Sequence, residues 1–159
     1  MKYPRAMREP VNIGDLLAAG RLKKHTPRRD EVSDLLAIAD RRLHDAGVAE
    51  LSSDGRFASA YGASLSLVTI VVVASGFRVG HAAGHHRLTI ELLPALKGEH
   101  EREQAAYLNA CRRKRNLGEY ERAGVVTEAE ARALADAAGK LRADVIAWLE
   151  FEHPELAPK

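Results

Sequence analysis

The sequence contains a single cysteine, Cys111, and only 5% of its residues are aromatic. One cysteine cannot form an intrachain disulfide, and it cannot build a cysteine-based metal site. With so few aromatic rings, the core has to consist mainly of Ala, Leu and Val. Such small side chains favour close packing between helices, so the composition already points to an all-α protein.

A long hydrophobic run is also missing. Residues 65–74 are apolar but include Ser66 and Thr69, and a membrane-spanning helix needs about 20 apolar residues. Residues 1–5 lack the apolar core of a signal peptide. No Gly-Lys-Ser/Thr follows Gly80 and Gly84, so they do not form a phosphate loop. The sequence therefore predicts a cytoplasmic protein with no membrane contact, no metal and no cofactor.

What is present is enough for one ordinary domain. The chain has 159 residues, of which 46% are hydrophobic, and its net charge is only +2. The positive charge is clustered, in residues 21–29 and again in residues 112–115. Local basic clusters can bind phosphate even in a nearly neutral protein. The whole chain, however, is not a polycation that would coat nucleic acid.

Apolar residues recur at three- and four-residue spacing, which is typical of amphipathic helices. Together with capping residues and glycines, this spacing predicts an all-α five-helix bundle over residues 26–153. An irregular N-terminal arm, residues 1–25, precedes the bundle, and a tail, residues 154–159, follows it. The five helices are predicted at residues 26–45, 52–75, 85–96, 99–117 and 127–153. The apolar run 65–74 is predicted to be a helix buried in the bundle core or at a dimer interface.

The most informative segment is Cys111-Arg-Arg-Lys-Arg-Asn-Leu-Gly-Glu-Tyr120. Arg112, Arg113 and Lys114 are predicted to bind phosphate groups, because cations satisfy these anions. Arg115, Asn116 and Tyr120 can also hold phosphate oxygens, through guanidinium, amide and phenol groups. A solvated helix end is the alternative, because cations near a helix C-terminus interact favourably with the helix dipole.

From residue 53 onward the pattern resembles the HEPN family, small helical proteins of prokaryotic toxin–antitoxin and defence systems. The resemblance rests on Arg56-Phe57, Tyr61, Gly84-His85-His86, Gly98, Asn109, the Arg-rich run, Tyr120 and Thr127-x-x-Glu130. It implies a five-helix fold and a homodimer. It also implies a composite RNA-cleaving site in which Arg and His converge from both subunits.

The family's usual mark is an Arg, often followed by a polar residue, with a His four to six residues further on. Either Arg113 or Arg115 matches that Arg, but no His lies between Glu101 and Glu152. Tyr is a poor base at pH 7, because its pKa is about 10. The resemblance therefore implies weak or absent ribonuclease activity, unless His85 or His86 reaches the Arg run. For these two residues, capping and loop packing is the alternative role.

Three readings follow. The first is a HEPN-like homodimer of a stress, toxin–antitoxin or defence context. It would bind RNA, a nucleotide or a protein partner, such as a cognate toxin or antitoxin, through residues 112–120, and would not be an enzyme. The second is a metal-independent ribonuclease that uses Arg115, Asn116 and Tyr120 with His85 or His86. The third is a helical scaffold protein in which the arginines only pair with acids.

Overall fold

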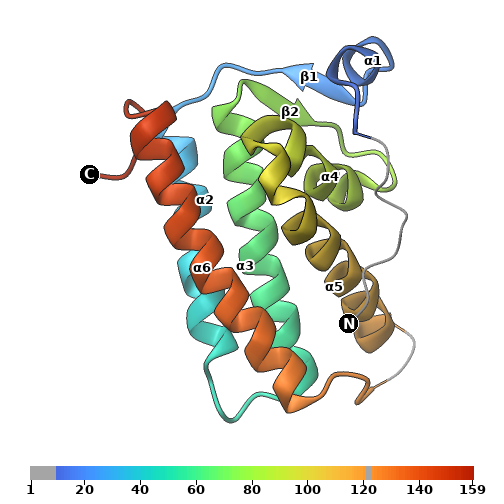
Figure 1. Ribbon diagram of the computed structural model, residues 1–159. Coiled ribbons are helices and arrows are strands. Elements are labelled where there is room, and N and C mark those ends of the chain that lie inside the picture. Colours follow the sequence, from blue (N-terminus) through green and yellow to red (C-terminus); the bar gives the residue numbers. More distant parts are fainter. Residues whose placement is uncertain (1–9, 121–122) are drawn as a thin grey trace.

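The protein is an assembly of helices with one small two-stranded sheet (Figure 1). The computed structural model describes residues 10–120 and 123–159, and for residues 119 and 120 it describes only the backbone. The predicted all-α character is confirmed, and the long helices lie close to their predicted positions. The α-helices in this part of the chain are α1 (Ile13–Ala18), α2 (Arg29–Ala46), α3 (Ser53–Ala74), α4 (His85–Lys97), α5 (Arg102–Tyr120) and α6 (Glu128–Glu152).

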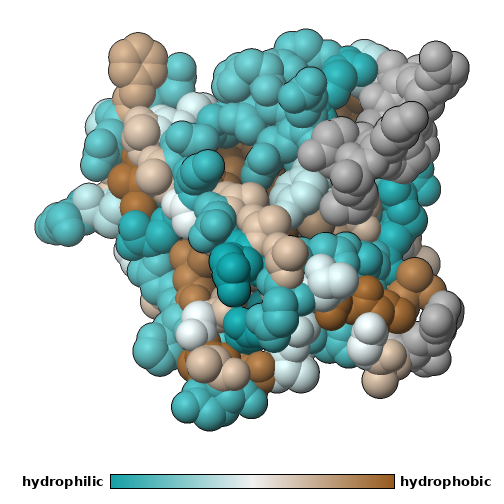
Figure 2. Space-filling view, turned by 60° about the horizontal axis from the view of Figure 1, so that its bottom comes forward, coloured by the Kyte–Doolittle hydropathy of each residue, from teal (hydrophilic) through white to brown (hydrophobic). Residues whose placement is uncertain are grey.

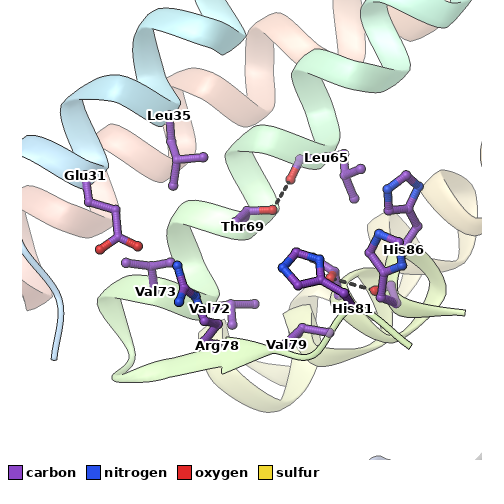
Figure 3. A pocket seen from close by; sticks show the side chains of 12 residues that line it. Glu31, Leu35, Leu65, Thr69, Val72, Val73, Arg78, Val79, His81 and His86 are labelled. Atoms are coloured by element: carbon purple, nitrogen blue, oxygen red, sulfur yellow. Dashed lines mark hydrogen bonds between the residues drawn. The ribbon is translucent and has the colours of Figure 1, made fainter. Parts of the chain in front are cut away.

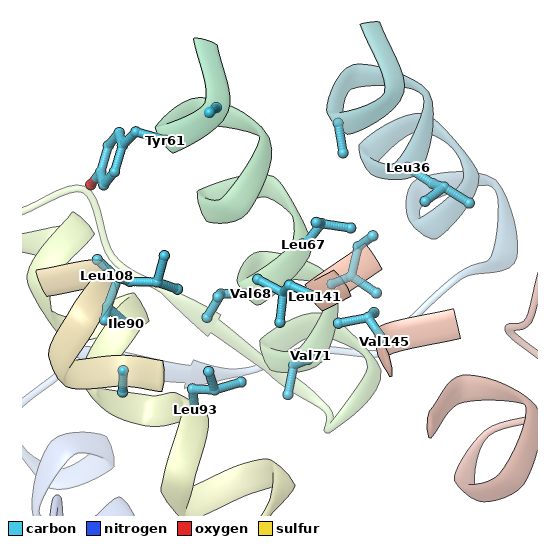
Figure 4. Close-up of a cluster of buried hydrophobic side chains, with 14 of the residues drawn as sticks. Leu36, Tyr61, Leu67, Val68, Val71, Ile90, Leu93, Leu108, Leu141 and Val145 are labelled. Carbon is cyan, nitrogen blue, oxygen red and sulfur yellow. The ribbon is translucent and has the colours of Figure 1, made fainter. Parts of the chain in front are cut away.

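Helix α3 is the centre of the bundle, with α2 and α6 on one side and α4 and α5 on the other (Figure 1). Its C-terminal half, from Leu67 to Ala74, is almost entirely buried, and Val68 and Val71 lie among side chains from the surrounding helices (Figure 4). By length and composition alone α3 could cross a membrane, but 72% of its most apolar window is buried inside the protein. The prediction of a core helix for residues 65–74 is confirmed. Because helices of the same chain cover α3, its burial does not require a dimer.

Helix α6 begins where the sequence predicts. Thr127 accepts a hydrogen bond from the Glu130 backbone, and the Glu130 side chain accepts one from the Thr127 backbone, which completes a capping box. The connection from α5 is tied to α3 through Asp54, whose carboxylate accepts hydrogen bonds from the backbone N–H groups of Gly124 at 2.7 Å and Val126 at 3.2 Å. The start of α6 is therefore fixed against the start of α3.

A short antiparallel ribbon was not predicted. Strand β1 (Leu22–Lys24) pairs with β2 (Phe77–Val79), with Leu22 opposite Val79. Both strands have three residues, too few for an alternating pattern to appear in the sequence. The prediction of an irregular arm is therefore wrong for β1, and the predicted loop after residue 76 contains β2. The sequence also indicates a short helical turn at Asp15–Ala19, and α1 (Ile13–Ala18) lies there. The ribbon covers a second apolar cluster formed by Leu16, Leu22, Val72, Leu88 and Leu92.

Two predicted helix ends are also corrected. Helix α2 starts at Arg29 rather than at Thr26-Pro27, and its N-cap residue, Arg28, has an extended backbone and no side-chain cap. Helix α5 continues through Gly118 to Tyr120. A single glycine costs a helix only about 1 kcal/mol, which does not end one that is held by packing on its neighbours. Between α4 and α5, a short 3-10 turn, η2, spans Glu99–Glu101.

The surface is mainly hydrophilic at the end of the bundle where α2 joins α3. Figure 2 shows this end, where hydrophobic side chains gather only in small patches outside the grey atoms. Elsewhere in the described chain, Phe151 near the end of α6 is the most exposed large hydrophobic side chain, at 84%. Single exposed hydrophobic residues are common on soluble proteins and do not by themselves mark an interface.

Candidate functional site

The arginine-rich run of α5 is divided between different sides of the helix, because successive residues are about 100° apart around its axis. Arg112 lies one turn from the buried Asn109, and its Nε donates a hydrogen bond to the Asn109 amide oxygen at 2.9 Å. Arg115 lies one turn further on and has a longer contact, 3.4 Å, to the amide oxygen of Asn116. Arg112 and Arg115 therefore share the side of α5 that faces Tyr61 of α3.

Lys114 lies on another side of α5. Its ammonium group forms an ion pair with Glu130 of α6, and this hydrogen bond is the main reason why the pKa of the Glu130 carboxyl lies below its usual value. Lys114 is thus used to hold α5 against α6. Arg113 is half-buried, and its charge acts on Arg112. The four predicted cations do not form one continuous surface.

Tyr61 lies between the arginines and the helix core. Its side chain is 2% exposed, and the Arg115 guanidinium carbon is 5.6 Å from its ring centroid. In Figure 4 it lies at one edge of the core cluster, with its hydroxyl pointing away from the aliphatic side chains. The buried hydroxyl has no hydrogen-bond partner among the described residues. Burial raises the pKa of Tyr61 to about 12, against the opposing effect of Arg112 and Arg115, so the phenol keeps its proton.

His85 and His86 open α4, directly after Gly84, whose φ of 81° is a left-handed conformation. The two rings are 4.3 Å apart, and the His86 ring centroid is 6.4 Å from that of Tyr61. Burial is the largest cause that lowers the pKa of His86, followed by the charges of His85, Arg115, Arg112 and Arg42. A neutral imidazole that can accept a proton is therefore placed within the field of three arginines.

Arg42 of α2 was missed by the sequence reasoning, which treated this helix only as part of the bundle. Its Nη1 donates a hydrogen bond to the Gly62 carbonyl at 3.1 Å. A Cβ at Gly62 would lie 2.8 Å from the same nitrogen, so the glycine leaves room for the guanidinium against α3. The available signal was Gly62 itself, because a glycine inside an apolar helix often marks a close approach.

We call Arg42, Arg112 and Arg115, with Tyr61 and His86, the arginine site. Two of its three guanidinium groups have uncharged hydrogen-bond partners in the described part of the chain, the Asn109 amide for Arg112 and the Gly62 carbonyl for Arg42. Burial is the largest cause that lowers the pKa of Arg112, although the group stays charged. Positive charge is thus concentrated at this site, and among the described residues neither Arg42 nor Arg112 has a carboxylate hydrogen-bond partner.

A pocket of about 300 Å³ lies next to this site, between α2, α3, β2 and α4 (Figure 3). Its walls are largely aliphatic, and Thr69 on its surface donates its hydroxyl to the Leu65 carbonyl at 2.8 Å. Glu31 and Arg78 lie towards one side, and His81 and His86 towards the other (Figure 3). His86 therefore belongs to both the pocket and the arginine site. The full lining is Glu31, Leu35, Leu65, Thr69, Val72, Val73, Arg78, Val79, His81, His85, His86 and Thr89.

Tyr120 and Cys111 are the remaining residues that the sequence analysis considered. The Tyr120 side chain, predicted as a catalytic group, lies outside the described residues. Cys111 is fully buried, and burial raises the pKa of its thiol to about 12, so it is the buried small hydrophobic residue that the sequence predicts. In residues that the structure describes, no three His, Cys, Asp or Glu side chains are arranged to hold a metal ion.

No family model matches this sequence, and no curated protein or solved structure is significantly similar to it. The arginine site, the adjoining pocket and the sequence patterns are therefore the features from which a function is inferred.

Proposed function

We propose that this chain binds RNA by its phosphates at the arginine site. The observation that supports this most directly is that Arg115 of α5 lies 5.6 Å from the ring centroid of Tyr61, while Arg42 of α2 is hydrogen-bonded to the carbonyl of the next residue, Gly62. The charges of both, and that of Arg112, act on His86. Like charges repel, so an anion that binds near these guanidinium groups would stabilise them. Guanidinium groups also fit phosphate oxygens in bidentate geometry, which makes phosphate the matching ligand.

The Tyr61 hydroxyl provides the second argument. A buried donor without a partner costs a protein roughly 1–3 kcal/mol, and such groups are rare outside functional sites. The Tyr61 hydroxyl has this status at the edge of the core, beside Arg115. A phosphate oxygen held by Arg112 and Arg115 would accept its proton in a hydrogen bond once the side chains that cover the hydroxyl move aside. The scaffold alternative does not account for this donor.

The wider setting is part of the same proposal. The order of helices and the residues that resemble HEPN proteins support a HEPN-like fold and RNA as the source of the phosphates. On this proposal the protein is a cytoplasmic homodimer that works in a stress, toxin–antitoxin or defence context. The dimer would bring two arginine sites to one RNA. Alternatively, one arginine site would bind RNA and the other a cognate protein partner.

The second candidate is a metal-independent ribonuclease, and the position of His86 favours it. A neutral imidazole with a lowered pKa can take the proton of a ribose 2′-hydroxyl, after which the 2′-oxygen attacks phosphorus and the 5′-oxygen leaves with a proton. Arg112 and Arg115 would stabilise the charge that develops on the phosphoryl oxygens. His85, whose ring lies 4.3 Å from that of His86, would be the proton donor to the leaving oxygen.

Binding is tested with fluorescein-labelled single-stranded RNA and fluorescence anisotropy. Arg42→Ala is compared with Arg41→Ala, which removes the same charge from an exposed neighbour on α2. We expect Arg42→Ala to weaken binding about tenfold, because a charged hydrogen bond to phosphate contributes about 1.5 kcal/mol or more. Arg41→Ala should leave the dissociation constant within about twofold, and equal effects of both variants would contradict the proposal.

Cleavage is tested with the same RNA in the presence of EDTA, using the wild-type protein, Arg115→Ala and His86→Ala. Loss of cleavage in both variants would establish the ribonuclease reading. Binding without cleavage in the wild-type protein would leave the non-enzymatic RNA-binding function. Size-exclusion chromatography with light scattering measures the oligomeric state, and a monomer would exclude the dimer.

A further inference from the structure

The pocket beside the arginine site has the dimensions and walls of a small-ligand site. Its volume of about 300 Å³ is at the lower end of the range for such sites. Leu35 of α2, Leu65 of α3 and Val79 of β2 provide aliphatic surface on three sides (Figure 3). A flat apolar group of modest size could therefore lie against these three walls.

The polar groups of the pocket lie at its two sides. Towards β1, Glu31 is fixed by His25, whose Nε2 lies 2.7 Å from the Glu31 carboxylate. Towards the arginine site, the imidazole rings of His81 and His85 are 6.0 Å apart, and His86 follows directly. These rings offer aromatic faces and ring nitrogens to the edge of a planar ligand. Such a combination of apolar walls, ring faces and edge-directed polar atoms suits a heteroaromatic ring.

The position of His86 connects the pocket to the cations. It lines the pocket, its ring lies 6.4 Å from Tyr61, and the charges of Arg112 and Arg115 act on it. Helix α3 also joins the two sites, because Leu65 lines the pocket and Tyr61 of the arginine site lies one helical turn earlier. A ligand in the pocket that extends past His86 therefore reaches the arginine site with its next group, where the positive charges favour an anion.

We propose that the pocket holds the nucleobase of the nucleotide whose phosphate binds at the arginine site. This inference rests on the proposed function and adds a recognition site for the base to it. One ribose separates a base from its phosphate, so a single nucleotide has the required order of apolar ring, polar spacer and anion. The nucleotide is a residue of single-stranded RNA, whose bases are free to leave the stack, or a free mononucleotide, which has the same chemistry.

The test compares ligands with and without a base by isothermal titration calorimetry. The probes are uridine monophosphate, adenosine monophosphate, ribose 5-phosphate and a hexauridylate RNA. We expect the wild-type protein to bind at least one mononucleotide about tenfold more tightly than ribose 5-phosphate, because enclosing or stacking one base contributes at least that factor. Tighter binding of the hexauridylate than of its mononucleotide identifies RNA as the source, and equal binding identifies the free nucleotide.

Thr69→Phe fills the pocket from α3 without removing a core side chain, since Thr69 is half-buried and its hydroxyl is hydrogen-bonded to the Leu65 carbonyl of its own helix. Thr26→Phe, in the exposed connection between β1 and α2, is the matched control. We expect Thr69→Phe to weaken mononucleotide binding to the level of ribose 5-phosphate, while ribose 5-phosphate itself binds as before. Circular dichroism melts confirm that both variants are folded, and Thr69→Leu replaces Thr69→Phe if the larger side chain prevents folding.

The two proposals fail in different ways. If ribose 5-phosphate and the mononucleotides bind equally and Thr69→Phe changes neither, the base site is refuted while phosphate binding at the arginine site stands. If no probe binds to the wild-type protein, both are refuted. If mononucleotide binding is lost in Thr69→Phe but unchanged in Arg42→Ala and Arg112→Ala, the pocket binds a ring without the arginine site, and the proposed arrangement of one nucleotide across both is refuted.

Discussion

Replacing Tyr61 by Phe should make this protein more stable and at the same time weaken its binding of phosphate. The Tyr61 hydroxyl is buried without a hydrogen-bond partner in the described structure. An unpartnered buried hydroxyl costs roughly 1–3 kcal/mol, and its removal leaves a small void that offsets part of the gain. We expect the free energy of unfolding to rise by about 1 kcal/mol. For a domain of this size, the melting temperature should then rise by roughly 2–4 °C.

The aromatic ring is kept in Tyr61→Phe, so the contact between its face and the Arg115 guanidinium at 5.6 Å remains. Only the hydrogen bond to a bound phosphate is lost. Since a hydrogen bond to a charged group contributes about 1.5 kcal/mol or more, RNA binding should weaken about tenfold. A hydroxyl that lowers the stability of the free protein but strengthens ligand binding shows the trade-off between stability and function that is expected of a binding group.

Stability is measured by urea unfolding followed by circular dichroism, and binding by fluorescence anisotropy of labelled RNA. Tyr107→Phe is the control, because Tyr107 acts on the Cys111 thiol and lowers its pKa, so the loss of the Tyr107 hydroxyl should bring no gain in stability. A destabilised Tyr61→Phe protein would show that the Tyr61 hydroxyl has a partner in the free protein. Increased stability with unchanged RNA affinity would refute its role in binding.

Three further predictions concern other parts of the molecule. The pKa of His86 is lowered on folding, so the His86 imidazole of the unfolded chain is protonated at a higher pH than that of the folded protein. The free energy of unfolding should therefore fall as pH decreases below about 6.5. His86→Gln should flatten this part of a plot of unfolding free energy against pH. Thr127→Ala breaks the capping box and should lower the free energy of unfolding by about 1 kcal/mol in urea melts, whereas an unchanged midpoint would contradict the capping argument. The Cys111 thiol, with a pKa of about 12, should react with Ellman's reagent at neutral pH only after denaturation, and rapid labelling of the folded protein would be inconsistent with its burial.

The long helices could be predicted because their information is local. The Thr127 capping box, Gly98 and the spacing of Leu134, Ala138, Leu141 and Val145 each act within a few residues, and all have the predicted roles in the structure. The ribbon could not be predicted, because Leu22 and Val79 pair across a long stretch of chain. Three residues in each strand are too few to specify their partner by pattern.

In the candidate site, too, features set by local sequence could be predicted and features set by the packing of distant helices could not. The sequence singled out Arg112, Arg115 and His86, since their residue types and order are visible without a fold. It could not show that Lys114 pairs with Glu130 of α6, because helix geometry separates Lys114 from its neighbours but does not say which side meets which helix. Arg42 was missed for a related reason: only the antiparallel packing of α2 on α3 brings it over Gly62.

The central position of α3 has a consequence for how the chain is made. Helix α3 leaves the ribosome well before α6, which packs along it in the finished protein. At about 5–20 residues per second, its apolar surface stays incompletely covered for several seconds of synthesis. During that interval a segment with the length and hydropathy of a membrane helix is exposed and can bind chaperones, membranes or other nascent chains. Slower translation before α6, or truncation of α6, should therefore reduce the yield of soluble protein before it affects any binding site.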